Sequence, residues 1–188
     1  MALTTLDPIT ALIVIDLQKG IVGAPFVHPL VDVVARARAL IDAFRVCGLP
    51  VALVNVAGRP PGRTERRSTQ NAAPPEGWTD LIPELNRQAG DIVVTKRTWG
   101  AFANTDLEAK LKALGVTQVV IAGVATATGV ESTARQAYEH GFNVTLAIDA
   151  MTDRRPEAHV YSITQVFPRL GETGTSQEII DLLRIRSA

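Results

Sequence analysis

The sequence predicts a doubly wound α/β fold, with a mainly parallel, Rossmann-like sheet of about six strands and helices on both faces. Two observations lead to this prediction: short apolar runs recur along the chain, and amphipathic helical segments separate them. Strands buried on both faces show such continuous apolar runs instead of an alternating pattern. A chain of 188 residues suits one hydrophobic core, so we expect a single domain over residues 1–188.

Five apolar runs supply the expected buried strands. The first covers residues 11–15 and ends directly at Asp16. The others cover residues 51–56, 91–95, 118–122 and 143–148, and a short additional strand is expected before the last helix. Because parallel strands need crossover connections, the segments between these runs are expected to be helical.

The clearest helix is predicted over residues 29–47, where apolar side chains recur at i, i+3, i+4 and i+7. Pro29 suits its first turn and Gly48 its end. Further helices are expected over residues 105–114, 129–140 and 153–167, after Thr175, and, as a short element, over residues 78–86. The helices that begin near Thr105 and Thr175 each start with the Ser/Thr-x-x-Glu pattern of a capping box.

Residues 57–77 have no periodicity and are rich in Gly, Pro and Arg, including Arg59, Arg63, Arg66 and Arg67. Loops of this length inside a compact domain are usually functional or disordered. Three interpretations remain open for this segment: a mobile lid, an arm that contacts another subunit, or a solvated insertion.

Composition excludes several classes of partner. The chain has 19 basic and 19 acidic side chains and a pI near 6.8, so we expect neither nucleic acid nor a membrane as a partner. No apolar stretch is long enough to span a membrane and the first residues do not resemble a signal peptide, so we expect a cytoplasmic protein. The single cysteine, Cys47, rules out an internal disulfide.

Ligands in open parallel sheets bind outside the carboxyl ends of the strands. This rule selects Asp16, Asn55, Lys96, residues 123–126 and Asp149. An aspartate and a lysine at neighbouring strand ends form a plausible acid/base pair, because each stabilises the charged form of the other. The alternative is structural: Asp16 caps a turn and the lysine extends to solvent.

Three separated motifs carry a resemblance to a known family: residues 14–18 (VIDLQ), residues 95–102 (TKRTWGAF), and residues 121–126 (IAGVAT) followed by residues 130–135 (VESTAR). In order and spacing they resemble the isochorismatase-like hydrolase superfamily over essentially the whole chain. The resemblance implies a small-molecule substrate and a homodimer or homotetramer. It also implies a cis peptide bond between Val124 and Ala125.

The resemblance further implies a catalytic triad of aspartate, lysine and cysteine, in which Asp16 and Lys96 match the first two members. The cysteine position falls at Gly129, which has no side chain to act as a nucleophile. Glycine here resembles true isochorismatases, which hydrolyse a vinyl ether without a covalent intermediate and whose matching aspartate is the general acid. Those enzymes carry an aromatic residue and a histidine where this chain has Arg97 and Ala127.

We therefore expect a hydrolase that activates water by acid/base chemistry, with Asp16 as acid or base, Lys96 as electrostatic partner, and Gly129 leaving room for substrate or water. The alternative is a catalytically silent binding or interaction protein that has lost its nucleophile. No metal or other cofactor is expected, since the histidines form no Asp-x-His cluster and no GxGxxG follows the first strand. The residues expected to bind substrate are Gln18, Trp99, Phe102, Val124, Ala125 and Thr128.

Overall fold

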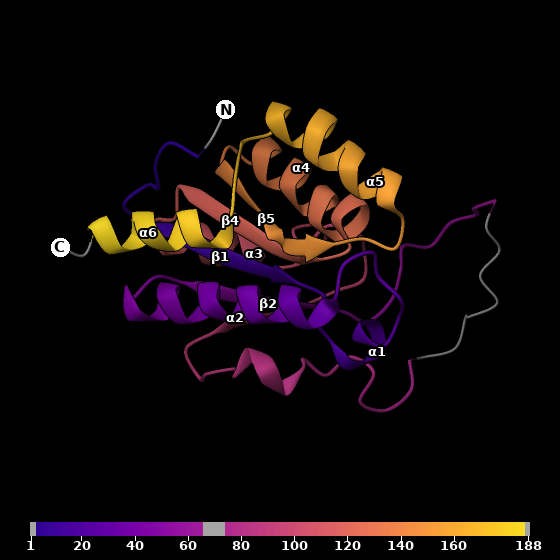
Figure 1. Ribbon diagram of the computed structural model, residues 1–188. Helices are drawn as coiled ribbons and strands as arrows, with labels where there is room; N and C mark the ends of the chain where they lie inside the picture. Colours follow the sequence, from indigo (N-terminus) through magenta and orange to yellow (C-terminus); the bar gives the residue numbers. More distant parts are fainter. Residues whose placement is uncertain (1–2, 66–73, 187–188) are drawn as a thin grey trace.

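The computed structural model describes residues 3–65 and 74–186, and these residues form an α/β structure around one sheet. Its strands are β1 (Thr10–Ile15), β2 (Val51–Val56), β3 (Ile92–Lys96), β4 (Gln118–Val124), β5 (Asn143–Thr152) and β6 (Glu172–Gly174). They lie in the order β3-β2-β1-β4-β5-β6, and every neighbouring pair is parallel (Figure 1). The predicted fold class is confirmed.

The α-helices are α1 (Lys19–Val22), α2 (Leu30–Val46), α3 (Leu107–Ala113), α4 (Glu131–Glu139), α5 (Pro156–Tyr161) and α6 (Ser176–Arg186). One-turn π-helices precede α4 (η2, Thr126–Val130) and follow α5 (η3, Ser162–Val166), and short 3-10 turns cover Pro83–Leu85 and Phe167–Arg169. Within the two described ranges, no helix combines the length and apolar character that crossing a bilayer requires.

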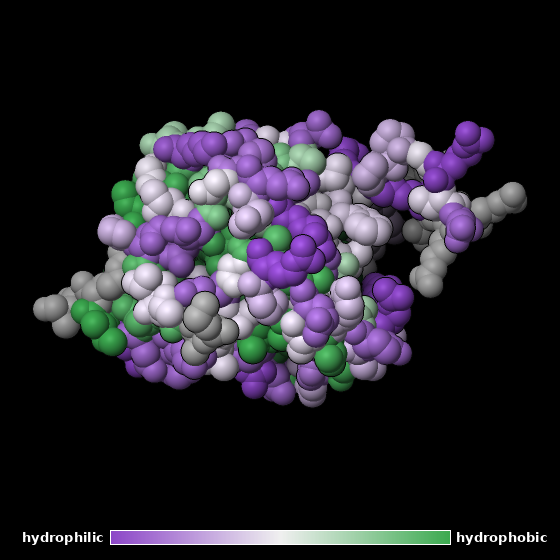
Figure 2. Space-filling model, turned by 90° about the horizontal axis from the view of Figure 1, so that it is seen from above, coloured by the Kyte–Doolittle hydropathy of each residue, from purple (hydrophilic) through white to green (hydrophobic). Residues whose placement is uncertain are grey.

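Strands β1, β2, β4 and β5 each contribute to two cores because successive side chains point to opposite faces of a sheet. In β1, Leu12 and Val14 pack with the apolar faces of α2 and α6, which lie together on one side (Figure 1). Ile13 and Ile15 pack on the other side with residues of α3 and α4. Hydrophilic side chains predominate on the surface over α4 and α5, with hydrophobic side chains scattered among them (Figure 2).

The two predicted capping boxes have different outcomes. At α6, the backbone N–H of Thr175 donates to Glu178 Oε2 (2.7 Å) and the N–H of Glu178 donates to Thr175 Oγ1 (3.2 Å), so this box forms. At α3, Glu108 instead pairs with Lys112, and the helix begins at Leu107, two residues later than predicted. Because the carboxylate of Glu108 binds Lys112 one turn along the helix, it does not bond to the backbone at the start of α3 as a capping box requires.

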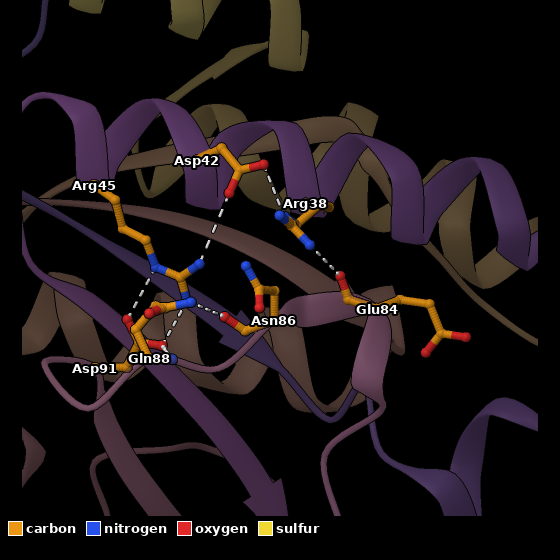
Figure 3. Close-up of polar contacts among 7 residues, drawn as sticks. All are labelled: Arg38, Asp42, Arg45, Glu84, Asn86, Gln88 and Asp91. Atoms are coloured by element: carbon orange, nitrogen blue, oxygen red, sulfur yellow. Dashed lines mark hydrogen bonds and ion pairs between the residues drawn. The ribbon is translucent and has the colours of Figure 1, made fainter.

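A network of polar side chains attaches α2 to the segment before β3 (Figure 3). Arg45 binds both carboxylate oxygens of Asp91, at 2.5 and 3.2 Å, and Arg38 donates to the backbone carbonyl of Glu84. Asp91 also accepts the backbone N–H of Gln88 (2.7 Å). These bonds hold an irregular connection in which the helix predicted over residues 78–86 is reduced to the 3-10 turn Pro83–Leu85.

Residues 58–65, which follow β2, extend away from the body of the molecule (Figures 1 and 2). Residues 58–65 and 74–76 are exposed. Arg66 and Arg67 of the predicted arginine-rich loop lie outside the described residues. The choice between lid, subunit contact and solvated insertion stays open for the segment.

Candidate active site

Asp16 and Lys96 meet at the carboxyl end of the sheet. Asp16 follows β1 directly and Lys96 is the last residue of β3, two positions away across β2. Lys96 Nζ lies 2.7 Å from Asp16 Oδ2, and the side chains of the lysine and the aspartate are only 2% and 8% exposed. Lys96 Nζ also donates to the carbonyl of Thr98 (3.3 Å). The structure thus brings together the two residues that the sequence predicts as a pair, although their strands are separated by β2 and are not neighbours as expected.

Burial controls the protonation of Asp16. Desolvation raises its pKa from 3.8 to about 6, although the charge and hydrogen bond of Lys96 act in the opposite direction. Asp16 Oδ1 is buried and has no hydrogen-bond partner among the described residues. One carboxylate oxygen is therefore held by the lysine and the other makes no hydrogen bond with the described residues, in a group whose pKa lies within about one unit of neutral pH.

Gly129 lies directly against this pair. It belongs to the π-turn η2, which follows β4, the strand next to β1. A Cβ atom added at residue 129 would lie 2.9 Å from Ile15 Cγ2, 3.1 Å from Asp16 Oδ2 and 3.2 Å from the carbonyl oxygen of Val124. The expectation that glycine leaves room here needs correction, because the space next to its Cα is too small even for a methyl group without movement of its neighbours.

Room for a substrate lies beside Gly129, in a cavity of about 480 Å³. Its lining includes seven of the predicted site residues: Asp16, Lys96, Trp99, Val124, Ala125, Thr128 and Gly129. The peptide bond between Val124 and Ala125 is cis, as the resemblance implies. Trp99 is 62% exposed and forms part of the outer wall.

Two predicted binding residues lie elsewhere. Gln18 is fully buried, and its side chain bonds to both backbone groups of Val56 and to the carbonyl of Trp78. It therefore joins the chain after β1 to the end of β2 and to Trp78. Phe102 is 5% exposed and packs near Phe142 in the core, with ring centroids 5.8 Å apart. Neither is among the residues that line the cavity, so the geometry gives no support to the expected substrate contact, which stays a prediction for both.

Strand-end reasoning missed an important part of the lining: Phe26, Arg59, Asp153, Arg154 and Arg155. It chose Asp149 instead, which accepts hydrogen bonds from the backbone and hydroxyl of Ser176 and so anchors α6. The cause is a register shift: Ile121 pairs with Leu146, 25 residues ahead, whereas Gly123 pairs with Met151, 28 residues ahead. The shifted pairing continues β5 to Thr152, beyond the end predicted at residue 148, and brings Asp153 to the cavity.

The charges around the cavity are unequal. Its lining includes four cationic residues, Lys96 and the three arginines, and two carboxylates, Asp16 and Asp153. Neither Arg154 nor Arg155 forms an ion pair with a carboxylate of residues 3–65 or 74–186. Cationic side chains arranged in this way attract an anionic ligand.

The comparisons with known proteins cover nearly the whole chain. Residues 10–178 match the isochorismatase domain family. The chain is 38% identical to the uncharacterized isochorismatase family protein YwoC of Bacillus subtilis, over 93% of this chain and 94% of the relative. It is 30% identical to the maleamate amidohydrolase of Pseudomonas putida, over 93% of this chain and 86% of the relative. A solved structure of an isochorismatase family protein from Burkholderia thailandensis is 41% identical, with a TM-score of 0.86 and coverage of 96% and 98% of the two chains.

Proposed function

The chain belongs to the isochorismatase family of hydrolases, and from this membership and the geometry of its site we propose that it hydrolyses a small anionic organic substrate without forming a covalent enzyme intermediate. The observation that carries the proposal is the buried Asp16–Lys96 pair beside a residue that cannot act as a nucleophile. The proposed mechanism has two parts: Asp16 supplies the proton, and water is the attacking group.

Asp16 supplies the proton. With a pKa near 6, about a tenth of the carboxyl is protonated at pH 7, far more than for an aspartate with its ordinary pKa of 3.8. In the proposed reaction, protonated Asp16 donates its proton to the substrate as the scissile bond weakens, and a water molecule adds to the resulting electron-poor carbon. The proton lost by that water returns to the carboxylate, so the enzyme is regenerated and the net reaction is hydrolysis. Lys96 stabilises the carboxylate while it is ionised.

The attacking group is water because no thiol lies at the site. Gly129 occupies the position at which the family resemblance places a cysteine. Cys47, the single cysteine of the sequence, lies at the end of α2, with Sγ 3.9 Å from the carbonyl of Leu183 in α6. Thioester chemistry needs a thiolate in contact with the reacting carbon.

The anionic substrate class is supported by Arg59, Arg154 and Arg155 around the cavity. The maleamate amidohydrolase relative acts, by its name, on a small anion that carries both a carboxylate and an amide. Arginine binds carboxylates through paired N–H donors and keeps its charge at all physiological pH values. We expect the substrate's anionic group at the arginines and its scissile bond near Asp16.

An activity screen tests the proposal. Purified protein is incubated with small vinyl ethers, amides and carbamoyl compounds, each with and without a carboxylate, alongside Asp16→Asn. We expect turnover of at least one carboxylate-bearing compound and its loss in the variant. Binding of these compounds without turnover would favour the alternative of a silent binding protein, and equal turnover by Asp16→Asn would contradict the assigned role of Asp16.

A further inference from the structure

Asp153 is a buried carboxylate at the cavity that the proposed chemistry does not use. The residue is 5% exposed and lies one position beyond β5. Its Oδ2 accepts the backbone N–H of Ala127 (2.8 Å), and its Oδ1 accepts the backbone N–H groups of Arg154 (2.8 Å) and Arg155 (3.2 Å). Both oxygens are therefore occupied by backbone donors from two different segments of the chain.

The first of these segments is the turn that carries Gly129. Within it, the N–H groups of Thr128 and Val130 both donate to the carbonyl of Ala125, at 3.1 and 3.2 Å. The N–H of Ala127 leaves the turn and donates to Asp153. Asp153 thus ties the turn to β5 at a residue midway between Ala125 and Gly129, both of which line the cavity.

The second segment carries the cationic side chains. Its two N–H bonds to Asp153 set the direction in which the backbone leaves β5 at Arg154 and Arg155. The guanidinium carbon of Arg154 lies 5.8 Å from the ring centroid of Phe26, within the range of a cation–π contact. Phe26 is held in turn because the next residue, Val27, donates its N–H to the carbonyl of Asp153 (2.8 Å).

We propose that Asp153 is a positioning residue that sets the distance between the arginines that bind the substrate's anionic group and the turn beside the proton donor Asp16. This inference rests on the proposed function for its role in the reaction. Its structural basis is independent of that function: the carboxylate of Asp153 joins the turn at Ala127 to the segment of Arg154 and Arg155. The backbone carbonyl of the same residue holds Val27, so Asp153 joins three segments of the cavity wall. A substrate held at both ends would sense any change in this spacing in binding and in turnover.

Asp153→Asn tests the proposal because it keeps the size of the side chain and replaces one acceptor oxygen by an NH2 group. That group then faces either the N–H of Ala127 or those of Arg154 and Arg155, and two donors cannot bond to each other. We expect amide exchange measured by NMR to become at least about tenfold faster at Ala127 or at the two arginines. This measurement needs no substrate, so its outcome is separate from that of the activity screen.

Kinetics with a substrate from the screen provide the second measurement. We expect Asp153→Asn to raise KM and to lower kcat together, whereas a purely structural residue would change only thermal stability. Asp149→Asn is the matched control: Asp149 lies on β5, accepts two bonds from Ser176, pairs with Arg36 and does not line the cavity, so kcat and KM should hold while Tm falls. Unchanged exchange at all three amides, or faster exchange with unchanged kcat and KM, would overturn the proposal. Asp153→Ala, which removes both acceptors without adding a donor, provides the same two measurements if the asparagine variant does not fold.

Discussion

Lys96→Met removes the cation that holds the pKa of Asp16 down while keeping an apolar chain of similar length. The lysine nitrogen lies 2.7 Å from the carboxylate and is almost completely buried. At that separation and an effective dielectric constant of about 20, the Coulomb attraction is about 6 kcal/mol, part of which offsets desolvation of the pair. An adjacent opposite charge lowers a carboxyl pKa by about 1 to 3 pH units. Removing it should therefore raise the pKa of Asp16 from about 6 to between about 7 and 9.

The assay is a titration of the Asp16 carboxyl carbon by NMR, in protein labelled at aspartate, with assignment by comparison with Asp16→Asn. Where a substrate is available, the pH dependence of kcat/KM should show the same displacement to higher pH, because this parameter reports ionisations of the free enzyme. Lys19→Met is the control, since its ion pair with Asp80 is about half exposed and outside the cavity. An Asp16 pKa that stays near 6 or falls in Lys96→Met would refute the assignment of Lys96 as the group that opposes desolvation.

The other predictions concern stability, chemistry and assembly. Folding raises the pKa of Asp16 from 3.8 to about 6. The contribution of this group to the free energy of unfolding is therefore complete below pH 3.8 and falls by about 3 kcal/mol as the pH rises through 6. In urea denaturation measured over this pH range, the double variant Asp16→Asn/Lys96→Met should lack the decline. Arg45→Met should lower the free energy of unfolding by about 3 kcal/mol, because it leaves the buried carboxylate of Asp91 without its cation, and a loss below about 1 kcal/mol would contradict this. Cys47→Ser and thiol alkylation should leave turnover within about twofold, and inactivation of folded protein by alkylation would contradict the water-based mechanism. EDTA should also leave turnover within about twofold, and inactivation by EDTA would contradict the expected absence of a metal. We expect a homodimer or homotetramer in analytical ultracentrifugation, and a monomer at micromolar concentration would count against it.

The frame of this fold could be predicted because its signals are local. Continuous apolar runs mark the strands, and the periodicity of residues 30–46 marks α2 within a residue at each end. Asp16 and Lys96 could be predicted because each follows or ends such a run, and the carboxyl ends of parallel strands share one edge of the sheet. The order of the strands, which was not predicted, places the side chains of these two residues, 80 positions apart, in contact across β2.

The remaining part of the site depended on features without a local signal. Gln18 and Phe102 lie in the same motifs as Asp16 and Lys96. The side chain of Gln18 bonds to the backbone and that of Phe102 packs in the core. Residue spacing alone does not distinguish such positions from positions that line a cavity. Asp153 was missed because the extension of β5 depends on its pairing with β4, which is a tertiary property. Arg59 belongs to a loop without periodicity, so its position beside the cavity could not be predicted from pattern.

The extended part of β5 also has an evolutionary consequence. The offset of three residues between the two registers separates the first half of the strand from the second half, which pairs with β4 again at Met151 and Thr152 and ends beside the cavity. A deletion or insertion within residues 147–150 would change which side chain stands at the cavity while every upstream pairing with β4 stayed intact. Substrate preference in this architecture can therefore diverge through small changes in the length of one strand, without replacement of Asp16 or Lys96.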